Sequence, residues 1–167
     1  MKRSAKRRRM RAGVTMIEAV ASMVIVSGAM VAALNAVSAA RATQITLGER
    51  GRARLLAESL MAEALAKDYM EVGSTSIGPD SGESGGNTRS QYDDVDDYDG
   101  WSNDVLAPDG SEVAGFEGYE LSFAVEWVSP SNPGLVVGTD QGVKRVTVTI
   151  QRNSRVVAEL RGWTAEP

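Results

Sequence analysis

Five aspartates are concentrated near the middle of the chain. They lie within residues 93–101, which read Asp-Asp-Val-Asp-Asp-Tyr-Asp-Gly-Trp. Carboxylate oxygens at this spacing are ligands that Ca²⁺ prefers, because this hard cation takes roughly six to eight oxygens. A bound cation would also relieve the repulsion between the like charges. The candidate ligands are Asp94, Asp96, Asp97 and Asp99.

The cluster does not follow the pattern of an EF-hand loop. If Gly100 were the glycine of such a loop, the first ligand would be Val95 and the closing glutamate would be Leu106. An acidic turn that is only solvated is therefore the alternative to a Ca²⁺ site. We expect the neighbouring Tyr98 and Trp101 to anchor the loop on the core. The alternative is that these two aromatic residues form an adhesive surface.

Histidine and cysteine are both absent from the chain. Without them there is no imidazole base, no thiolate nucleophile, no disulfide and no ordinary zinc site. A hydrolase built on paired carboxylates is not favoured either, because nothing in the sequence indicates a substrate cleft. We therefore expect no catalytic residues, no enzyme activity and no cofactor other than Ca²⁺ at the aspartate cluster.

A single carboxylate, that of Glu18, stands at the start of a long apolar segment. No charged residue occurs from Ala19 to Ala40, and an ionisable group beside such a segment is costly and commonly functional. As a helix the segment would be about 30 Å long, the thickness of the hydrocarbon core of a bilayer. Seven Lys and Arg residues precede it within residues 1–13, so the positive-inside rule keeps that end cytoplasmic and exports the rest.

A motif joins the basic leader to the apolar segment. It reads Gly13-Val14-Thr15-Met16-Ile17-Glu18. Together with its flanks it resembles the class III leader of type IV pilins and type II secretion pseudopilins. In that family Phe and Leu are usual where this chain has Val14 and Met16. The segment Asp-Asp-Val-Asp-Asp-Tyr-Asp-Gly is also similar to a segment of minor pilins of the MSHA (mannose-sensitive haemagglutinin) type.

The resemblance implies a processing step and an assembly. A prepilin peptidase would cut between Gly13 and Val14 and methylate the new N-terminus at Val14. Glu18 and Thr15 would serve assembly with other pilin or pseudopilin subunits on an inner-membrane platform. The implied protein is a structural subunit of a type IV pilus or a type II secretion filament, as a minor pilin or a pseudopilin. It would cross the inner membrane once, in contact with lipid, with an extracytoplasmic head.

Other interpretations of these residues stay open. An ordinary signal peptide would be cleaved near the small residues 36–40, and Thr15 with Glu18 would also serve as a capping box. A membrane-tethered extracytoplasmic binding protein would use the aspartate cluster to hold Ca²⁺ or a ligand. Nucleic acid is not an expected partner: the formal charge is −4, and removal of the seven leader cations leaves −11.

The rest of the sequence predicts the elements that position these residues. After a leader at 1–13 and the membrane half of a helix at 14–40, we expect an amphipathic half over 41–70. A region rich in Gly, Ser and Asp over 71–116 is predicted to be loop. The apolar residues of the amphipathic half recur with a helical period and are Ala53, Leu56, Ala57, Leu60, Met61, Ala64 and Leu65.

Alternating apolar and polar residues predict strands in the last segment, 117–167. The alternation is clearest over 119–128 and 143–151, and Asn153-Ser154 is a predicted turn into 156–163. At least three antiparallel strands would present one apolar face, which the stripe of the helix would cover. The predicted fold class is therefore α+β, with a long N-terminal helix packed through its second half on a small antiparallel sheet.

Overall fold

The computed structural model describes residues 15–71, 73, 76–80, 83 and 88–167. The chain divides into two compact units, residues 1–46 and 47–167. Helix α1, Met16–Leu65, is the first element, and its residues belong to both units. Although α1 contains three glycines, at positions 28, 48 and 51, it is continuous over its whole length.

Helix α1 ends at Leu65, earlier than the end at residue 70 that the sequence predicts. Beyond it the backbone of Asp68 pairs with the aspartate cluster. The Asp68 N–H donates to the carbonyl of Asp93 at 3.4 Å, and the Val95 N–H donates to the carbonyl of Asp68 at 3.0 Å. The chain leaves the helix here because its backbone groups find partners in that loop.

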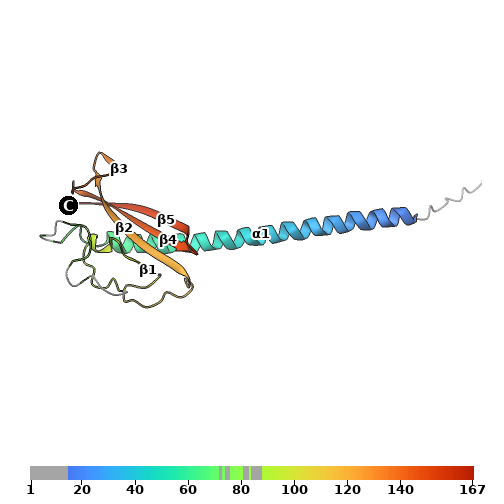
Figure 1. The fold of residues 1–167 in the computed structure, drawn as a ribbon, viewed down its shortest axis with the longest axis horizontal. Helices are drawn as coiled ribbons and strands as arrows, with labels where there is room; N and C mark the ends of the chain where they lie inside the picture. Colours follow the sequence, from blue (N-terminus) through green and yellow to red (C-terminus); the bar gives the residue numbers. More distant parts are fainter. Residues whose placement is uncertain (1–14, 72, 74–75, 81–82, 84–87) are drawn as a thin grey trace, which may run out of the picture. The chain divides into compact units, whose positions relative to one another are not determined.

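Five strands form one antiparallel sheet (Figure 1). Their bounds are β1 (Ser102–Asp104), β2 (Tyr119–Ser129), β3 (Asn132–Val136), β4 (Val143–Arg152) and β5 (Arg155–Ala165). The order along the sheet is β1-β2-β4-β5, and β3 pairs with the end of β2. Strands β4 and β5 are joined at Asn153 and Ser154, whose φ angles of 51° and 60° suit a two-residue hairpin turn.

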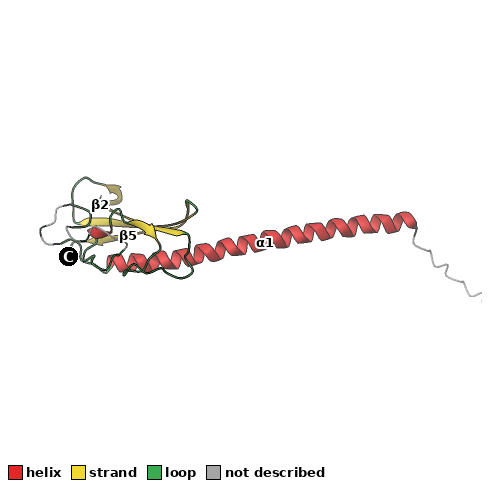
Figure 2. Ribbon diagram, turned by 60° about the horizontal axis from the view of Figure 1, so that its bottom comes forward, coloured by secondary structure: helices red, strands yellow, loops and turns green. Residues whose placement is uncertain are grey.

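One face of the sheet packs against the last turns of α1, which run beside the strands in Figure 2. The alanines of the predicted stripe, Ala53, Ala57 and Ala64, have no exposed surface. Gly162 of β5 allows a close approach, since a Cβ there would lie 2.6 Å from the sulfur of Met61. The strand residues that complete this core alternate along β2 and β4 and are Leu121, Phe123, Val125, Val146, Val148 and Ile150.

These elements confirm the predicted α+β class and the predicted strands. The region 71–116 differs from the expected plain loop, because it contains β1 and a short 3-10 helix, η1 (Asp96–Tyr98). Strand β1 has only three residues, all of them polar, and it forms by pairing with residues 120–122 of β2. Pairing between distant segments, which a local pattern does not reveal, accounts for this difference.

Candidate functional site

The residues predicted for assembly, Thr15 and Glu18, lie at the N-terminal end of α1. Gly13 and Val14 are outside the described residues. Thr15 immediately precedes the helix, and its Oγ1 accepts a hydrogen bond from the Glu18 N–H at 3.3 Å. This is one half of a capping box. The Glu18 side chain is exposed, and its carboxylate has no hydrogen bond or ion pair with any other described residue.

The N-terminal unit carries a long exposed apolar surface. Met16, Ile17 and Met23 have exposed fractions of 89%, 80% and 70%. Within the described part of the chain, α1 is the one helix long and apolar enough to cross a membrane, and its most apolar window has no buried share. Soluble monomeric domains rarely expose an apolar surface of this extent, so lipid or another protein is the natural cover for it.

The aspartate cluster is folded into the head. Asp94, Asp96 and Asp97 are each 2% exposed. Asp94 Oδ1 accepts hydrogen bonds from the N–H groups of Asp96 at 2.7 Å and Asp97 at 3.2 Å. Its Oδ2 accepts one from the N–H of Glu71 at 2.6 Å. Asp97 Oδ2 accepts the N–H groups of Asp93 at 2.9 Å and Asp94 at 3.1 Å. These bonds close the turn that contains η1.

Asp96 is paired with a buried lysine of β4. The Nζ of Lys144 lies 2.7 Å from Asp96 Oδ2, and the Lys144 side chain has no exposed surface. Lys144 also donates to the carbonyl of Tyr69 at 2.6 Å, and its Nζ lies 3.9 Å from the centre of the Tyr69 ring. Burial raises the pKa of Asp96 to about 6, although the ion pair with Lys144 acts in the opposite direction. The pair ties the aspartate cluster to the sheet.

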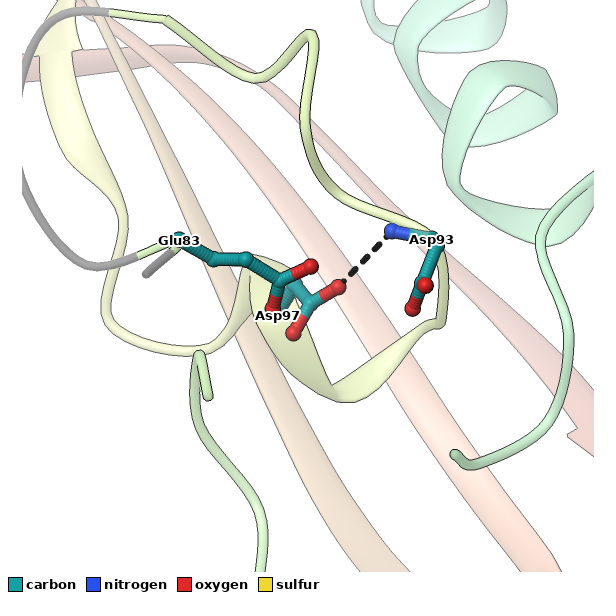
Figure 3. Close-up of side chains that lie close together, drawn as sticks. All are labelled: Glu83, Asp93 and Asp97. Atoms are coloured by element: carbon teal, nitrogen blue, oxygen red, sulfur yellow. Dashed lines mark hydrogen bonds between the residues drawn. The ribbon is translucent and has the colours of Figure 1, made fainter. Parts of the chain in front are cut away.

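The four predicted Ca²⁺ ligands do not converge on one point. Asp99, the fourth of them, accepts the backbone N–H of Val125 in β2 at 2.8 Å. Among the described residues the carboxylates that do converge are those of Glu83, Asp93 and Asp97, with one oxygen from each within 4.8 Å of the others (Figure 3). Only Asp97 belongs to both sets, so the Ca²⁺ hypothesis stays a prediction and acquires two new candidate ligands.

The carboxylates of Glu83 and Asp97 lie against each other in Figure 3. Loss of solvation, with the hydrogen bond to Asp97 and its negative charge, raises the pKa of Glu83 to about 7. Burial also raises the pKa of Asp94, which lies in the same turn. When two carboxylates lie in contact, the repulsion between their charges is relieved either by a proton that they share or by a bound cation.

Arg89 is the principal residue of the head that sequence reasoning missed. It is 1% exposed, and its Nε and one terminal nitrogen lie 3.0 Å and 3.3 Å from the two carboxylate oxygens of Glu63 on α1. Its guanidinium also donates to the carbonyl of Leu106 and stacks 4.6 Å from the ring of Trp101. Tyr98, fully buried, donates to Glu63 at 3.1 Å. Tyr98 and Trp101 therefore anchor the loop on the core, as predicted.

Comparison of the chain with models of protein families, with curated proteins and with solved structures finds no match. Function is therefore inferred from the N-terminal motif and from the arrangement of the described residues. The described residues show three features. The start of α1 is capped by Thr15 and carries the unpaired carboxylate of Glu18. The apolar first half of α1 is exposed, and the head contains buried ion pairs.

Proposed function

We propose that this protein is a structural subunit of a bacterial filament of the type IV pilus or type II secretion kind, a minor pilin or a pseudopilin. It would be made as an inner-membrane precursor with its head on the extracytoplasmic side. A prepilin peptidase would cut it after Gly13, and the mature chain would enter the filament through α1. The protein would thus be a substrate of an enzyme and have no enzyme activity of its own.

The observation that carries this proposal is the contrast within one continuous helix. Residues 19–40 of α1 are uncharged and almost wholly exposed, whereas Ala53, Ala57 and Ala64 further along the same helix have no exposed surface. A helix of this kind can hold a folded head at one end and leave the other end for lipid or for neighbouring helices. The leader motif that precedes it supports the same conclusion.

The proposed role of Glu18 follows from charge. The carboxylate has no described partner, and a charge at a membrane boundary is expensive. Cleavage after Gly13 would create a positive amine at Val14, four residues from Glu18. In a filament the amine of an adjacent copy could pair with this carboxylate. Attraction between the two charges is strong in a medium of low dielectric constant, so it would align an incoming subunit with its neighbours.

Intact-mass measurement of the protein extracted from membranes tests the proposal. The expected product lacks residues 1–13 and carries one added methyl group. The matched control is Gly13→Asp, which places a charged side chain at the cut and should leave the precursor uncleaved. A mature N-terminus near residues 39–42 would instead identify an ordinary signal peptide and overturn the proposal.

The second candidate function is a membrane-tethered binding protein that uses the acidic loop. The convergence of Glu83, Asp93 and Asp97 favours it. If this group binds Ca²⁺, the melting temperature of the head should rise with added Ca²⁺ and fall with chelator, by mass action on the folded state. Asp93→Asn should abolish the response, and Asp109→Asn, an exposed aspartate outside the group, should retain it. A flat titration up to millimolar Ca²⁺ would leave this candidate without support.

A further inference from the structure

A cavity of about 320 Å³ opens at the β1 edge of the sheet. It is formed by the end of β1 and by the chain that enters β2. Its lining combines an apolar floor with three carboxylates, and the side chains that matter here are Val105, Val113, Phe116, Asp104, Glu112 and Glu117. The cavity contains none of the clustered aspartates of residues 93–101, and the proposed processing and assembly motif does not use it.

Two of the three carboxylates lack a neutralising partner. Glu117 accepts the N–H of Gly115 at 3.0 Å, and this bond, with the nearby positive charge of Arg52, lowers the pKa of Glu117. Asp104 and Glu112 are exposed, and their carboxylates have no hydrogen bond or ion pair with any described residue. A cavity with excess negative charge over an apolar floor is complementary to an arginine side chain. The stem would pack on the floor, and the planar guanidinium would bind carboxylate in a bidentate manner.

A suitable arginine, Arg155, lies at the opposite edge of the same sheet, at nearly the same position along the strand direction as the cavity. Asp104 of β1 pairs with Glu120 of β2. One residue along β2, Tyr119 pairs with Arg152 of β4, which in turn pairs with Arg155 of β5. The cavity and Arg155 are thus separated by the width of the sheet and by about one residue along the strands.

The Arg155 side chain is available for a contact with another molecule, whereas that of its cross-strand neighbour Arg152 is already paired within the head. The side chain of Arg152 forms an ion pair with Glu49 of α1 and lies 4.9 Å from the Tyr119 ring. Arg155 is exposed, and no described residue forms an ion pair with its side chain. It stands beside the β4–β5 turn, where a neighbouring molecule can approach it.

We propose that the cavity at the β1 edge receives Arg155 of a second copy of this chain, so that heads associate edge to edge. The inference rests on the proposed function, because it assigns a contact between neighbouring subunits. The two surfaces are different and lie on opposite edges of the head, so the contact is heterologous. Each added copy leaves one empty cavity and one free arginine, and such a contact propagates instead of closing a dimer.

Cysteine pairing tests the contact directly, because the natural chain contains no cysteine. Filaments should be sheared from cells whose only copy of the chain carries Glu112→Cys and Arg155→Cys. Mild oxidation is expected to produce a ladder of dimers, trimers and higher species that reductant removes. The matched control replaces Arg155→Cys by Arg161→Cys on the same strand, where the native arginine already pairs with Glu159 at 2.8 Å. This control should give no ladder.

Charge exchange provides the second readout. Glu112→Arg or Arg155→Glu alone should reduce filament recovery several-fold, and the two together should restore it, because the charges are exchanged across the contact. Both residues are exposed, so circular dichroism of each single variant should match the wild type. Filaments that contain the Glu112→Cys and Arg155→Cys chain but give no ladder, or a ladder in the control only, would overturn the contact and leave the proposed function intact. Absence of wild-type protein from any filament would overturn both.

Discussion

The two ends of helix α1 have the same backbone conformation and opposite relations to their surroundings. Toward the N-terminus, residues 19–40 carry no charge and point apolar side chains outward on every face. Toward the C-terminus, charges return and only one stripe is buried, so that Leu60 is 5% exposed while Leu55 is 67% exposed. Helix propensity does not distinguish these two parts.

What distinguishes them is the placement of charge around the helix. An amphipathic stretch has one orientation in which its charges stay in water, and that orientation fixes which side chains meet the sheet. A stretch that is apolar on all faces has no such preference and is suited to lipid or to other apolar helices. We therefore expect substitutions in the C-terminal part to act on the stability of the head, and substitutions near the N-terminus to act on assembly.

The largest effect is expected from Leu60→Asp. Leu60 lies in the core between α1 and the sheet, and an unpaired charge buried there costs more than most small domains can lose. Thermal unfolding of the detergent-solubilised full chain, followed by circular dichroism, should show no cooperative transition of the head. Leu55→Asp is the matched control and should melt like the wild type. A folded Leu60→Asp head would contradict the proposed helix–sheet core.

The next largest effect is expected at the buried ion pair. Lys144→Ala leaves the Asp96 carboxylate buried without its cation, and removal of one partner of such a pair typically costs about 3–5 kcal/mol. Chemical denaturation measures this loss. Lys144→Met combined with Asp96→Leu should recover most of the stability, because both charges are then absent. Equal stability of Lys144→Ala and the wild type would show that the pair contributes nothing to folding.

Glu18→Gln examines the other end of the helix. The change keeps the shape of the side chain and removes its charge, so membrane insertion, cleavage and head stability should be unchanged. Recovery of the variant in sheared filaments should fall by about tenfold, which corresponds to about 1.4 kcal/mol of lost attraction. Levels in the membrane fraction serve as the control. Wild-type recovery would mean that Glu18 contributes only to the helix start.

The smallest effect is a pH dependence that comes from Glu83. Its pKa rises from 4.5 in the unfolded chain to about 7 in the head, so the folded state binds more protons between these values. This contribution to stability is complete below pH 4.5 and is lost as the pH rises through about 7. Because the side chain is partly solvated, we expect a change of about 1 kcal/mol or less. Glu83→Gln should flatten that part of the pH profile, and an unchanged profile would contradict the assignment.

Much of the fold could be predicted because its patterns are local. The helix stripe at Ala53, Ala57 and Ala64, the alternation in β2 and β4, and the turn at Asn153-Ser154 are all legible from neighbouring residues. Strand β1 and Arg89 could not be predicted, because both depend on partners far away in the chain. Arg89 lies in a polar stretch without periodicity, and its partners are Glu63 and Trp101.

Lys144 did carry a signal. It occupies the same alternate positions as Val146 and Val148, so a lysine was in phase with the buried face of β4. A charge at such a position requires a buried counter-charge, and the aspartate cluster supplies it from a segment 48 residues away in the chain. The predicted Ca²⁺ ligands failed to converge for the same reason, since Asp94 and Asp99 bind backbone N–H groups and Asp96 binds this lysine.

The alanine stripe has a mechanical consequence. Contacts between α1 and the rest of the head are distributed along the helix axis, from the ion pair of Glu49 with Arg152 to the fork of Arg89 on Glu63. A pull along this axis loads the contacts together, in shear, instead of opening them one after another. The small side chains of the stripe and Gly162 keep the helix close to the sheet. The helix can therefore move only slightly along the sheet before all of these contacts resist the movement. Tension that enters the head through its own helix would therefore be shared among these contacts.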